Sequence, residues 1–215
     1  MDFLTNINIQ FYFLAYFVGG IPFGLLLGKY IGGVDIKQSG SGSIGATNVL
    51  RVLKEKNSDL AKKLGATTLF LDAVKGIIVL AIATMAGVSE ETKWAIVVLV
   101  VIGHCFSPYL KFEGGKGVAA GAGVMLYMLP TETIIAIIVW VICIKTVKIS
   151  SVSSLLALTS LVIASFIIHP NIPVIHTHAP ILIVFFIIVY KHIPNIIGLF
   201  QGTEKKIKVN NETAA

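Results

Sequence analysis

The stretch "GATTLFLDAVKGIIVLAIATMA", residues 65–86, decides the class of fold. It is mostly apolar and carries no charge except at Asp72 and Lys75, and about 20 helical residues suffice to cross the hydrocarbon core of a bilayer. Further apolar runs follow along the whole chain, at residues 11–28, 94–110, 118–129, 131–144, 152–168 and 179–190. With 55% hydrophobic and 13% charged residues and a mean hydropathy of +0.87, the chain lies outside the range of soluble domains. The sequence therefore predicts a membrane protein.

The distribution of positive charge predicts the orientation of the chain, because cytoplasmic loops carry an excess of Lys and Arg. With seven spans and the N-terminus outside, the inside segments hold all of the 17 Lys and Arg residues except two. Lys93 lies outside, and Lys75 lies within a span. We therefore expect an all-α, polytopic membrane protein with seven transmembrane helices, an outside N-terminus and a cytoplasmic C-terminus. Residues 1–215 are expected to form a single integral-membrane domain.

Residues 118–144 are the weak point of this topology, since each of the two apolar runs there is shorter than a full span. One kinked span is the alternative. It would place Pro130 and Glu132 at mid-membrane and invert everything that follows, so that the charge asymmetry would disappear. Because an intramembrane carboxylate is costly, we expect two short helices, whose limits stay open.

Asp72 and Lys75 are the two ionisable residues within the run that spans residues 65–86. They are three residues apart, so they share one helix face and can neutralise each other. Charged residues in a span are costly, so both are expected to face the protein interior. A structural pair is at least as good an interpretation as a catalytic one.

Four polar clusters fall on the inside face of the predicted topology. They are "SGSGSIGATNVLR" at residues 39–51, "FEGGKGVAAG" at residues 112–121, "SSVSS" at residues 150–154 and "KHIPN" at residues 191–195. Glycine-rich turns and helix N-termini present backbone N–H groups to anions, and a cation completes a phosphate site. Arg51 and Lys116 supply that cation in the first two clusters. The common location of the clusters indicates an anion-binding site.

Several familiar signatures are absent. Gly40, Gly42 and Gly45 have the G-x-G-x-x-G spacing of a dinucleotide site, but they follow an apolar span rather than a strand of a βαβ unit. The chain has no Walker loop, no G-x-S-x-G elbow and no His-x₄-Asp signature of the other glycerolipid acyltransferase superfamily. Cys105 and Cys143 lie within apolar runs, so neither a disulfide nor a metal site is expected.

Taken together, the four clusters closely resemble the bacterial acyl-phosphate:glycerol-3-phosphate acyltransferase family, the PlsY-type membrane acyltransferases. The resemblance extends from Gly19 to Glu204 and includes "GHCFSPYLKFEGGKGVA" and "HIPNI…GTE". It implies a seven-span enzyme of the bacterial inner membrane with its site facing the cytoplasm. The implied reaction moves an acyl group from acyl phosphate to the 1-hydroxyl of glycerol 3-phosphate, without a covalent acyl-enzyme, and yields lysophosphatidic acid and phosphate.

The resemblance also implies roles for individual residues. Lys116, Arg51, Ser151, His192 and Asn195 would form the catalytic set, with Lys116 stabilising charge and the other four holding glycerol 3-phosphate. The substrate-binding set, mainly around the acyl phosphate, would be Ser39, Gly40, Ser41, Gly42, Thr47, Asn48, Gly114, Gly115 and Gly117. The hydroxyl proton would pass either to His192 or to the leaving phosphate. No cofactor, nucleic acid, carrier protein or coenzyme A is implied at the site, whose partners are the two substrates and membrane lipid.

A membrane transporter of phosphate or another small anion is the competing class. Such transporters commonly bind near the bilayer midplane, between repeated halves of the chain. Here the polar clusters gather at one face and the sequence shows no internal repeat. These two features favour the enzyme.

Overall fold

The computed structural model describes residues 5–204 and 206, which fold into helices and connecting loops with no strand among them. Lys205 and Lys208, which entered the charge argument, lie outside the described residues. The α-helices are α1 Ile7–Gly20, α2 Phe23–Tyr30, α3 Ala46–Lys54, α4 Ser58–Met85, α5 Glu90–Cys105, α6 Val118–Met128, α7 Pro130–Thr146, α8 Ser150–Ile168, α9 Ala179–Lys191 and α10 Ile193–Phe200, with a 3-10 turn η2 at Pro108–Leu110.

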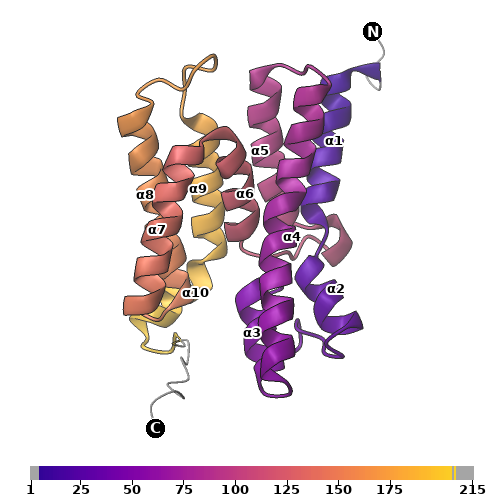
Figure 1. Cartoon of the computed structure of the whole chain (residues 1–215), viewed down its shortest axis with the longest axis vertical. Coiled ribbons are helices and arrows are strands. Elements are labelled where there is room, and N and C mark those ends of the chain that lie inside the picture. Colours follow the sequence, from indigo (N-terminus) through magenta and orange to yellow (C-terminus); the bar gives the residue numbers. More distant parts are fainter. Residues whose placement is uncertain (1–4, 205, 207–215) are drawn as a thin grey trace.

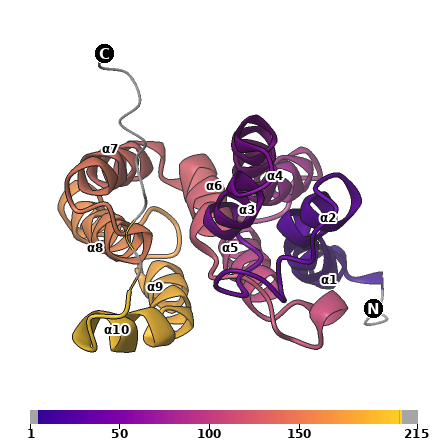
Figure 2. The same cartoon turned by 90° about the horizontal axis from the view of Figure 1, so that it is seen from below.

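The helices form two groups joined through α6 (Figure 1). One group contains α1 to α5, and the other contains α7 to α10; the view from below shows α6 between them (Figure 2). The main apolar core runs through both groups and includes Val100 of α5, Val124 of α6 and Ile188 of α9. A smaller core around Ile36 and Leu53 fixes α3 and the loop before it against the start of α4. The all-α expectation is confirmed.

Only part of the seven-span expectation is reproduced by helix length and composition. Within the described residues, four helices are long and apolar enough to cross a membrane, and α9 with α10 makes a fifth if this pair, bent by 53°, counts as one. The four are Ile7–Tyr30, Ser58–Met85, Glu90–Leu110 and Ser150–Ile168. The 11 residues of α6 extend only about 16 Å, against about 30 Å of hydrocarbon.

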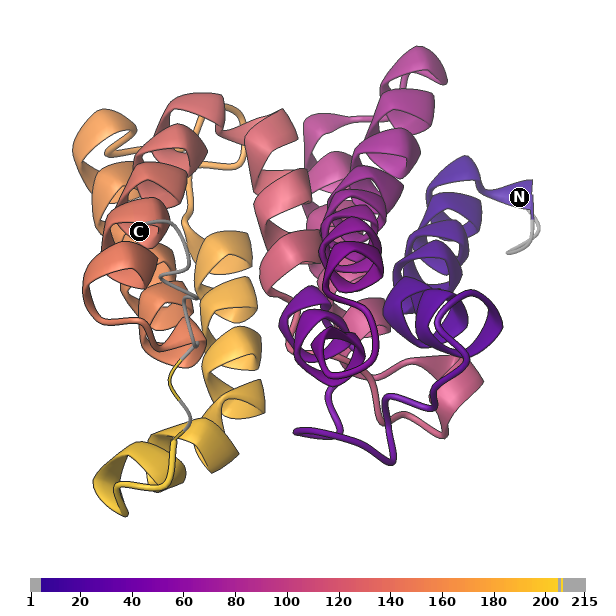
Figure 3. The same ribbon diagram turned by 60° about the horizontal axis from the view of Figure 1, so that its bottom comes forward.

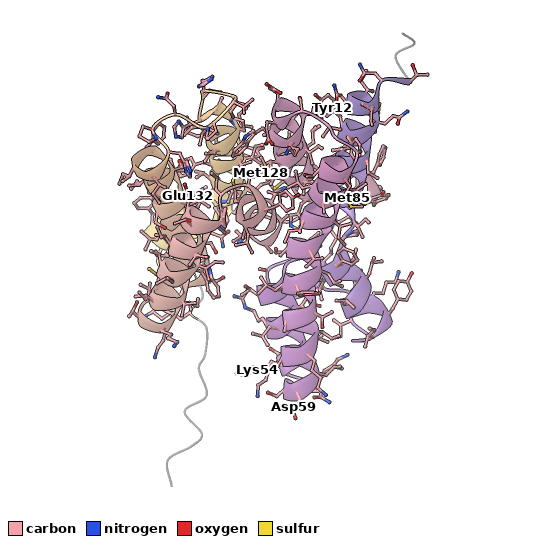
Figure 4. The ribbon with its side chains drawn as sticks, turned by 45° about the horizontal axis from the view of Figure 1, so that its top comes forward. Tyr12, Lys54, Asp59, Met85, Met128 and Glu132 are labelled. Carbon is pink, nitrogen blue, oxygen red and sulfur yellow. The ribbon has the colours of Figure 1, made fainter. Side chains whose placement is uncertain are left out.

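Residues 118–144 form two helices, as expected, and not one kinked helix. Leu129 has φ −137° and ends α6, and Pro130 starts α7 without needing an N–H partner. The chain reverses there, so that α6 and α7 run in opposite directions (Figure 3). Glu132 lies near this turn and is fully buried against the imidazole of His169, at the end of the molecule opposite Lys54 (Figure 4).

The first apolar run breaks where Pro22 removes a backbone donor between α1 and α2. The carbonyl groups freed by this break find other partners. Ser107 Oγ donates to the Gly20 carbonyl oxygen at 2.7 Å, and Lys75 Nζ donates to that of Ile21 at 3.1 Å. The break therefore ties the first span both to α4 and to the loop after α5.

Glycine allows the helices around this break to approach closely. A Cβ at Gly103 would lie 2.2 Å from the Tyr16 carbonyl oxygen, and one at Gly123 would lie 2.0 Å from that of Ala73. Side chains there would push the backbones apart, which is the usual reason for glycine at helix contacts in membranes. These contacts set α5 against α1 and α6 against α4.

Candidate active site

The four polar clusters meet in one cleft of about 280 Å³ between the two helix groups. The cleft lies where α3, α6 and α8 begin and where α9 turns into α10. Of the residues singled out from the sequence, those that line it are Gly40, Ser41, Thr47, Asn48, Arg51, Lys116, Gly117, Ser151, His192 and Asn195. Residues far apart in the chain are thus brought together as expected.

Three helix N-termini converge on this cleft. Ala46 and Thr47 begin α3, Val118 begins α6, and Ser150 and Ser151 begin α8; all of them line the cleft. The first N–H groups of a helix have no partner within the helix, and the helix dipole adds partial positive charge there. Thr47 Oγ1 and Ser150 Oγ lie 3.2 Å apart and join two of these N-termini across the cleft. The arrangement suits an anion.

Asn48 organises the loop that precedes α3. Its Nδ2 donates to the carbonyl oxygens of Ile36, Ser39 and Ser43 at 2.9, 3.1 and 2.8 Å. Its Oδ1 accepts the N–H of Ser41 at 2.9 Å. Gly40 and Gly42 have φ of +68° and +69°, a left-handed conformation that glycine adopts without strain. Asn48 therefore shapes the loop from within.

The backbone cradle expected from the glycines is largely used up by internal hydrogen bonds. The N–H of Gly42 donates to Ser39 at 3.2 Å, and those of Gly114 and Gly115 donate to the carbonyl oxygens of Cys105 and His104 at 3.1 and 2.9 Å. Ser39, Gly42, Gly114 and Gly115 also do not line the cleft. The N–H groups of Gly42, Gly114 and Gly115 therefore hold their own loops. Anion contacts fall to side chains and to the helix N-termini.

Lys116 and Arg51 supply the positive charge of the cleft. Burial lowers the pKa of Lys116 below its ordinary value; Glu204 raises it in part, and Arg51 lowers it further. Two cations that face one cleft repel each other, so an anion between them relieves this repulsion. The guanidinium of Arg51 provides a planar fork that suits a phosphate, whereas Lys116 acts as a point charge.

Glu204 is a cleft residue that sequence reasoning missed. Its Oε1 accepts from Ser151 Oγ at 2.6 Å and from Asn195 Nδ2 at 2.8 Å. Both donors belong to the set expected to hold glycerol 3-phosphate. The position of Glu204 in the "GTE" segment was the available signal, although a lone carboxylate after the last span indicates no partner by itself.

Other cleft residues that sequence reasoning did not place there come from apolar helices, where no local pattern marks them. They include Leu69, Asp72, His104 and Trp140. Asp72 and Lys75 form a buried ion pair at 2.9 Å, as the spacing predicted. Within residues 5–204 and 206, no group of three or more His, Cys, Asp or Glu side chains is arranged to hold a metal ion.

His192 occupies the bend between α9 and α10 and is 1% exposed. Its Nδ1 lies 2.7 Å from the Ile188 carbonyl oxygen. A carbonyl oxygen only accepts, so Nδ1 carries the hydrogen, and Nε2 of the neutral ring is left as an acceptor. His192 is therefore suited to accept a hydrogen bond from a hydroxyl group in the cleft.

An apolar groove of about 340 Å³ adjoins the polar cleft. Leu69, Val118, Ala119, Trp140 and Ser154 line both, so the two spaces lie side by side. The groove passes between α4, α6, α7, α8 and α9. A molecule with a charged head and a hydrocarbon chain matches this pair of spaces in polarity.

The fold and the cleft together define an integral-membrane protein of the class that handles an anionic group on a hydrocarbon chain. Residues 9–202 match the family described as "Glycerol-3-phosphate acyltransferase". The chain belongs to this family.

Relatives and solved structures agree with this assignment. Glycerol-3-phosphate acyltransferases of Sulfurimonas denitrificans and Wolinella succinogenes are 62% and 60% identical over 207 residues, covering 96% of this chain and 100% of each relative. Two crystal structures of PlsY, an integral membrane glycerol 3-phosphate acyltransferase, have TM-scores of 0.80 and 0.77 and identities of 29% and 28%. Each alignment covers 94% of this chain, with 96% and 95% of the crystal chains. They are the glycerol 3-phosphate and lysophosphatidic acid forms.

Proposed function

We propose that this protein is a glycerol-3-phosphate acyltransferase that transfers a fatty acyl group from acyl phosphate to the 1-hydroxyl of glycerol 3-phosphate. The products are lysophosphatidic acid and inorganic phosphate. The observation that carries the proposal is the junction of a cationic cleft with an apolar groove, since both substrates are anionic and one also carries a fatty chain. A transporter of small anions would have no use for the groove.

The reaction needs no covalent intermediate with the enzyme. The hydroxyl oxygen of glycerol 3-phosphate attacks the acyl carbonyl carbon, an ester C–O bond forms, and the C–O bond to the phosphate breaks. The hydroxyl proton passes to Nε2 of His192 or to the leaving phosphate. An acyl phosphate has a good leaving group, so orientation of the two substrates and stabilisation of charge suffice.

Charge neutralisation brings the two phosphates together. Arg51, Ser151 and Asn195 line the cleft and would hold glycerol 3-phosphate, as the family resemblance implies. Lys116 and the N-termini of α3 and α6 would face the acyl phosphate. Without these groups, the repulsion of two phosphates would oppose the approach of hydroxyl and carbonyl.

The fatty chain would occupy the apolar groove. Leu69, Leu126 and Ile137 line it and are 52%, 39% and 44% exposed, so its rim opens to the surroundings of the helices. In a membrane these surroundings are lipid. An acyl phosphate could therefore slide in sideways with its chain in the bilayer and its phosphate in the cleft.

A paired-donor assay tests the proposed function. Purified protein is expected to form lysophosphatidic acid from glycerol 3-phosphate and an acyl phosphate, and not from the corresponding acyl coenzyme A, because the cleft holds a phosphate leaving group. Product is measured with both donors and, as a control, without glycerol 3-phosphate. Efficient use of the thioester, or no product from folded protein, would overturn the proposal.

For the topology we propose seven crossings, an outside N-terminus and a cleft that faces the cytoplasm of a bacterial inner membrane. The antiparallel α6 and α7 support two separate crossings (Figure 3). The short α6 fits because it begins inside the cleft, so only the remaining depth of the bilayer has to be crossed. The excess of Lys and Arg in the segments near α3, α8 and α10 supports the orientation.

Labelling of single cysteines tests this topology. With two crossings in residues 118–144, a membrane-impermeant maleimide is expected to reach Asn171→Cys from outside and Val147→Cys only after the inner side is opened. One crossing would interchange these two results. Both positions are exposed in the structure, and the parent protein with only Cys105 and Cys143 measures the background.

A further inference from the structure

A buried polar cluster borders the cleft. Asp72 and Lys75 of α4 and His104 of α5 are each less than 5% exposed. Lys75 Nζ lies 2.9 Å from Asp72 Oδ1, 2.9 Å from His104 Nδ1 and 3.1 Å from the Ile21 carbonyl oxygen. Each of the three N–H bonds of the ammonium group thus has one acceptor.

This geometry determines which nitrogen of His104 carries the hydrogen. The ammonium group of Lys75 has no lone pair, so it only donates and Nδ1 has to accept. An ammonium group on Lys75 that donates to Nδ1 disfavours a second positive charge on the ring. His104 is therefore neutral, with its hydrogen on Nε2.

Nε2 is the ring nitrogen of His104 that is left to donate. The ring packs on Gly115, where a Cβ would lie only 2.2 Å from Nε2, and His104 is one of the residues that line the cleft. No described residue accepts a hydrogen bond from Nε2. Lys116 and Gly117 follow directly in the chain, and Val118 then lines both the cleft and the apolar groove. The N–H therefore lies near the border of cleft and groove, where the acyl carbonyl group of a bound acyl phosphate would join the fatty chain to the phosphate.

We propose that the Nε2–H of His104 donates a hydrogen bond to the acyl carbonyl oxygen of the bound acyl phosphate; this rests on the proposed function above. When the hydroxyl attacks, the electron pair of the carbonyl bond moves to this oxygen, and the donor stabilises the charge. The pair returns as the bond to phosphate breaks. His104 keeps its proton throughout, and Lys75 and Asp72 are positioning residues that fix its tautomer.

The two cleft histidines then have opposite tasks. Nδ1 of His192 is a donor to a carbonyl oxygen, which leaves Nε2 as an acceptor for the attacking hydroxyl. Nδ1 of His104 is an acceptor from an ammonium group, which leaves Nε2 as a donor. Each tautomer is fixed by a neighbour that has only one hydrogen-bonding role.

Kinetics of His104 variants test the proposal. His104→Ala is expected to lower kcat by about 10²- to 10³-fold, the usual effect of losing one oxyanion donor, with little change in KM for either substrate. His104→Gln is expected to recover most of this loss, because its amide nitrogen reaches the position of Nε2. A rise in KM for acyl phosphate at unchanged kcat, or wild-type kcat in His104→Ala, would overturn the proposal.

The positioning role has its own test. The double variant Asp72→Asn/Lys75→Met removes both charges and leaves neither unpaired, so it limits the damage to folding. It is expected to lower kcat less than His104→Ala does, and to cause little further loss when combined with it, since the three residues act together. Fully additive losses would show that the pair does not act through His104.

The tautomer is measurable without any turnover. Nitrogen NMR of the full chain in detergent, labelled with ¹⁵N at histidine, is expected to show His104 neutral with the proton on Nε2. The signals are assigned by their disappearance in His104→Gln. A proton on Nδ1 would overturn the inference, whereas failure of the donor assay with the expected tautomer would count against the proposed function instead.

Discussion

Replacement of Lys116 by alanine is expected to reduce turnover by about 10²- to 10³-fold or more, the range for loss of a preorganised charge-stabilising group. Lys116 lines the cleft between three helix N-termini, and burial lowers its pKa. A buried cation stabilises the developing negative charge more strongly than an exposed one, because the local dielectric is low. Lysophosphatidic acid formation at saturating substrates is the measurement.

The matched control for this variant is Lys111→Ala in the same loop. Lys111 is exposed and does not line the cleft, so its loss is expected to leave turnover unchanged. Neither lysine makes an ion pair among the described residues, so both variants should keep nearly the melting temperature of the parent. If Lys116→Ala retained turnover, Lys116 would be only a charge that orients the protein in the membrane.

Replacement of Arg51 by lysine is expected to raise KM for glycerol 3-phosphate by about 10- to 100-fold, with a smaller change in kcat. The guanidinium can hold a phosphate through two parallel hydrogen bonds, whereas an ammonium group cannot reproduce this fork. Loss of one hydrogen bond to a charged group costs about 1.5–3 kcal/mol, which corresponds to this range. KM for acyl phosphate should change less, because Arg51 is assigned to the other substrate.

Lys56→Ala is the matched control for Arg51. Lys56 is an exposed cation just after the same helix, and its removal tests whether net charge near α3 attracts the substrate. We expect the KM of Lys56→Ala for glycerol 3-phosphate to stay near that of the parent protein. An unchanged KM in Arg51→Lys would place the phosphate of glycerol 3-phosphate elsewhere in the cleft.

Sequence reasoning was most successful where one property of a short segment decides the outcome. Pro130 and the cost of placing Glu132 at mid-membrane favoured two helices over one, and the structure has two. The partners of the glycine N–H groups were not foreseen. Gly114 and Gly115 were expected to face a phosphate, yet their N–H groups donate to the end of α5. The accepting carbonyl groups of Cys105 and His104 come within reach of these N–H groups only after the chain has folded.

The sequence by itself determined the membrane class, the helical fold and the four polar segments that meet at the cleft, because hydropathy, charge and helix breaks are local properties of a chain. Only the tertiary structure decided which atoms of those segments are free. Glu204 meets Ser151 from 53 residues away, and Thr47 meets Ser150 from 103 residues away. His104 obtains its tautomer from Lys75 on another helix. A hydrogen bond requires donor and acceptor atoms about 3 Å apart, and residues so distant in the chain come within that reach only once the helices have packed.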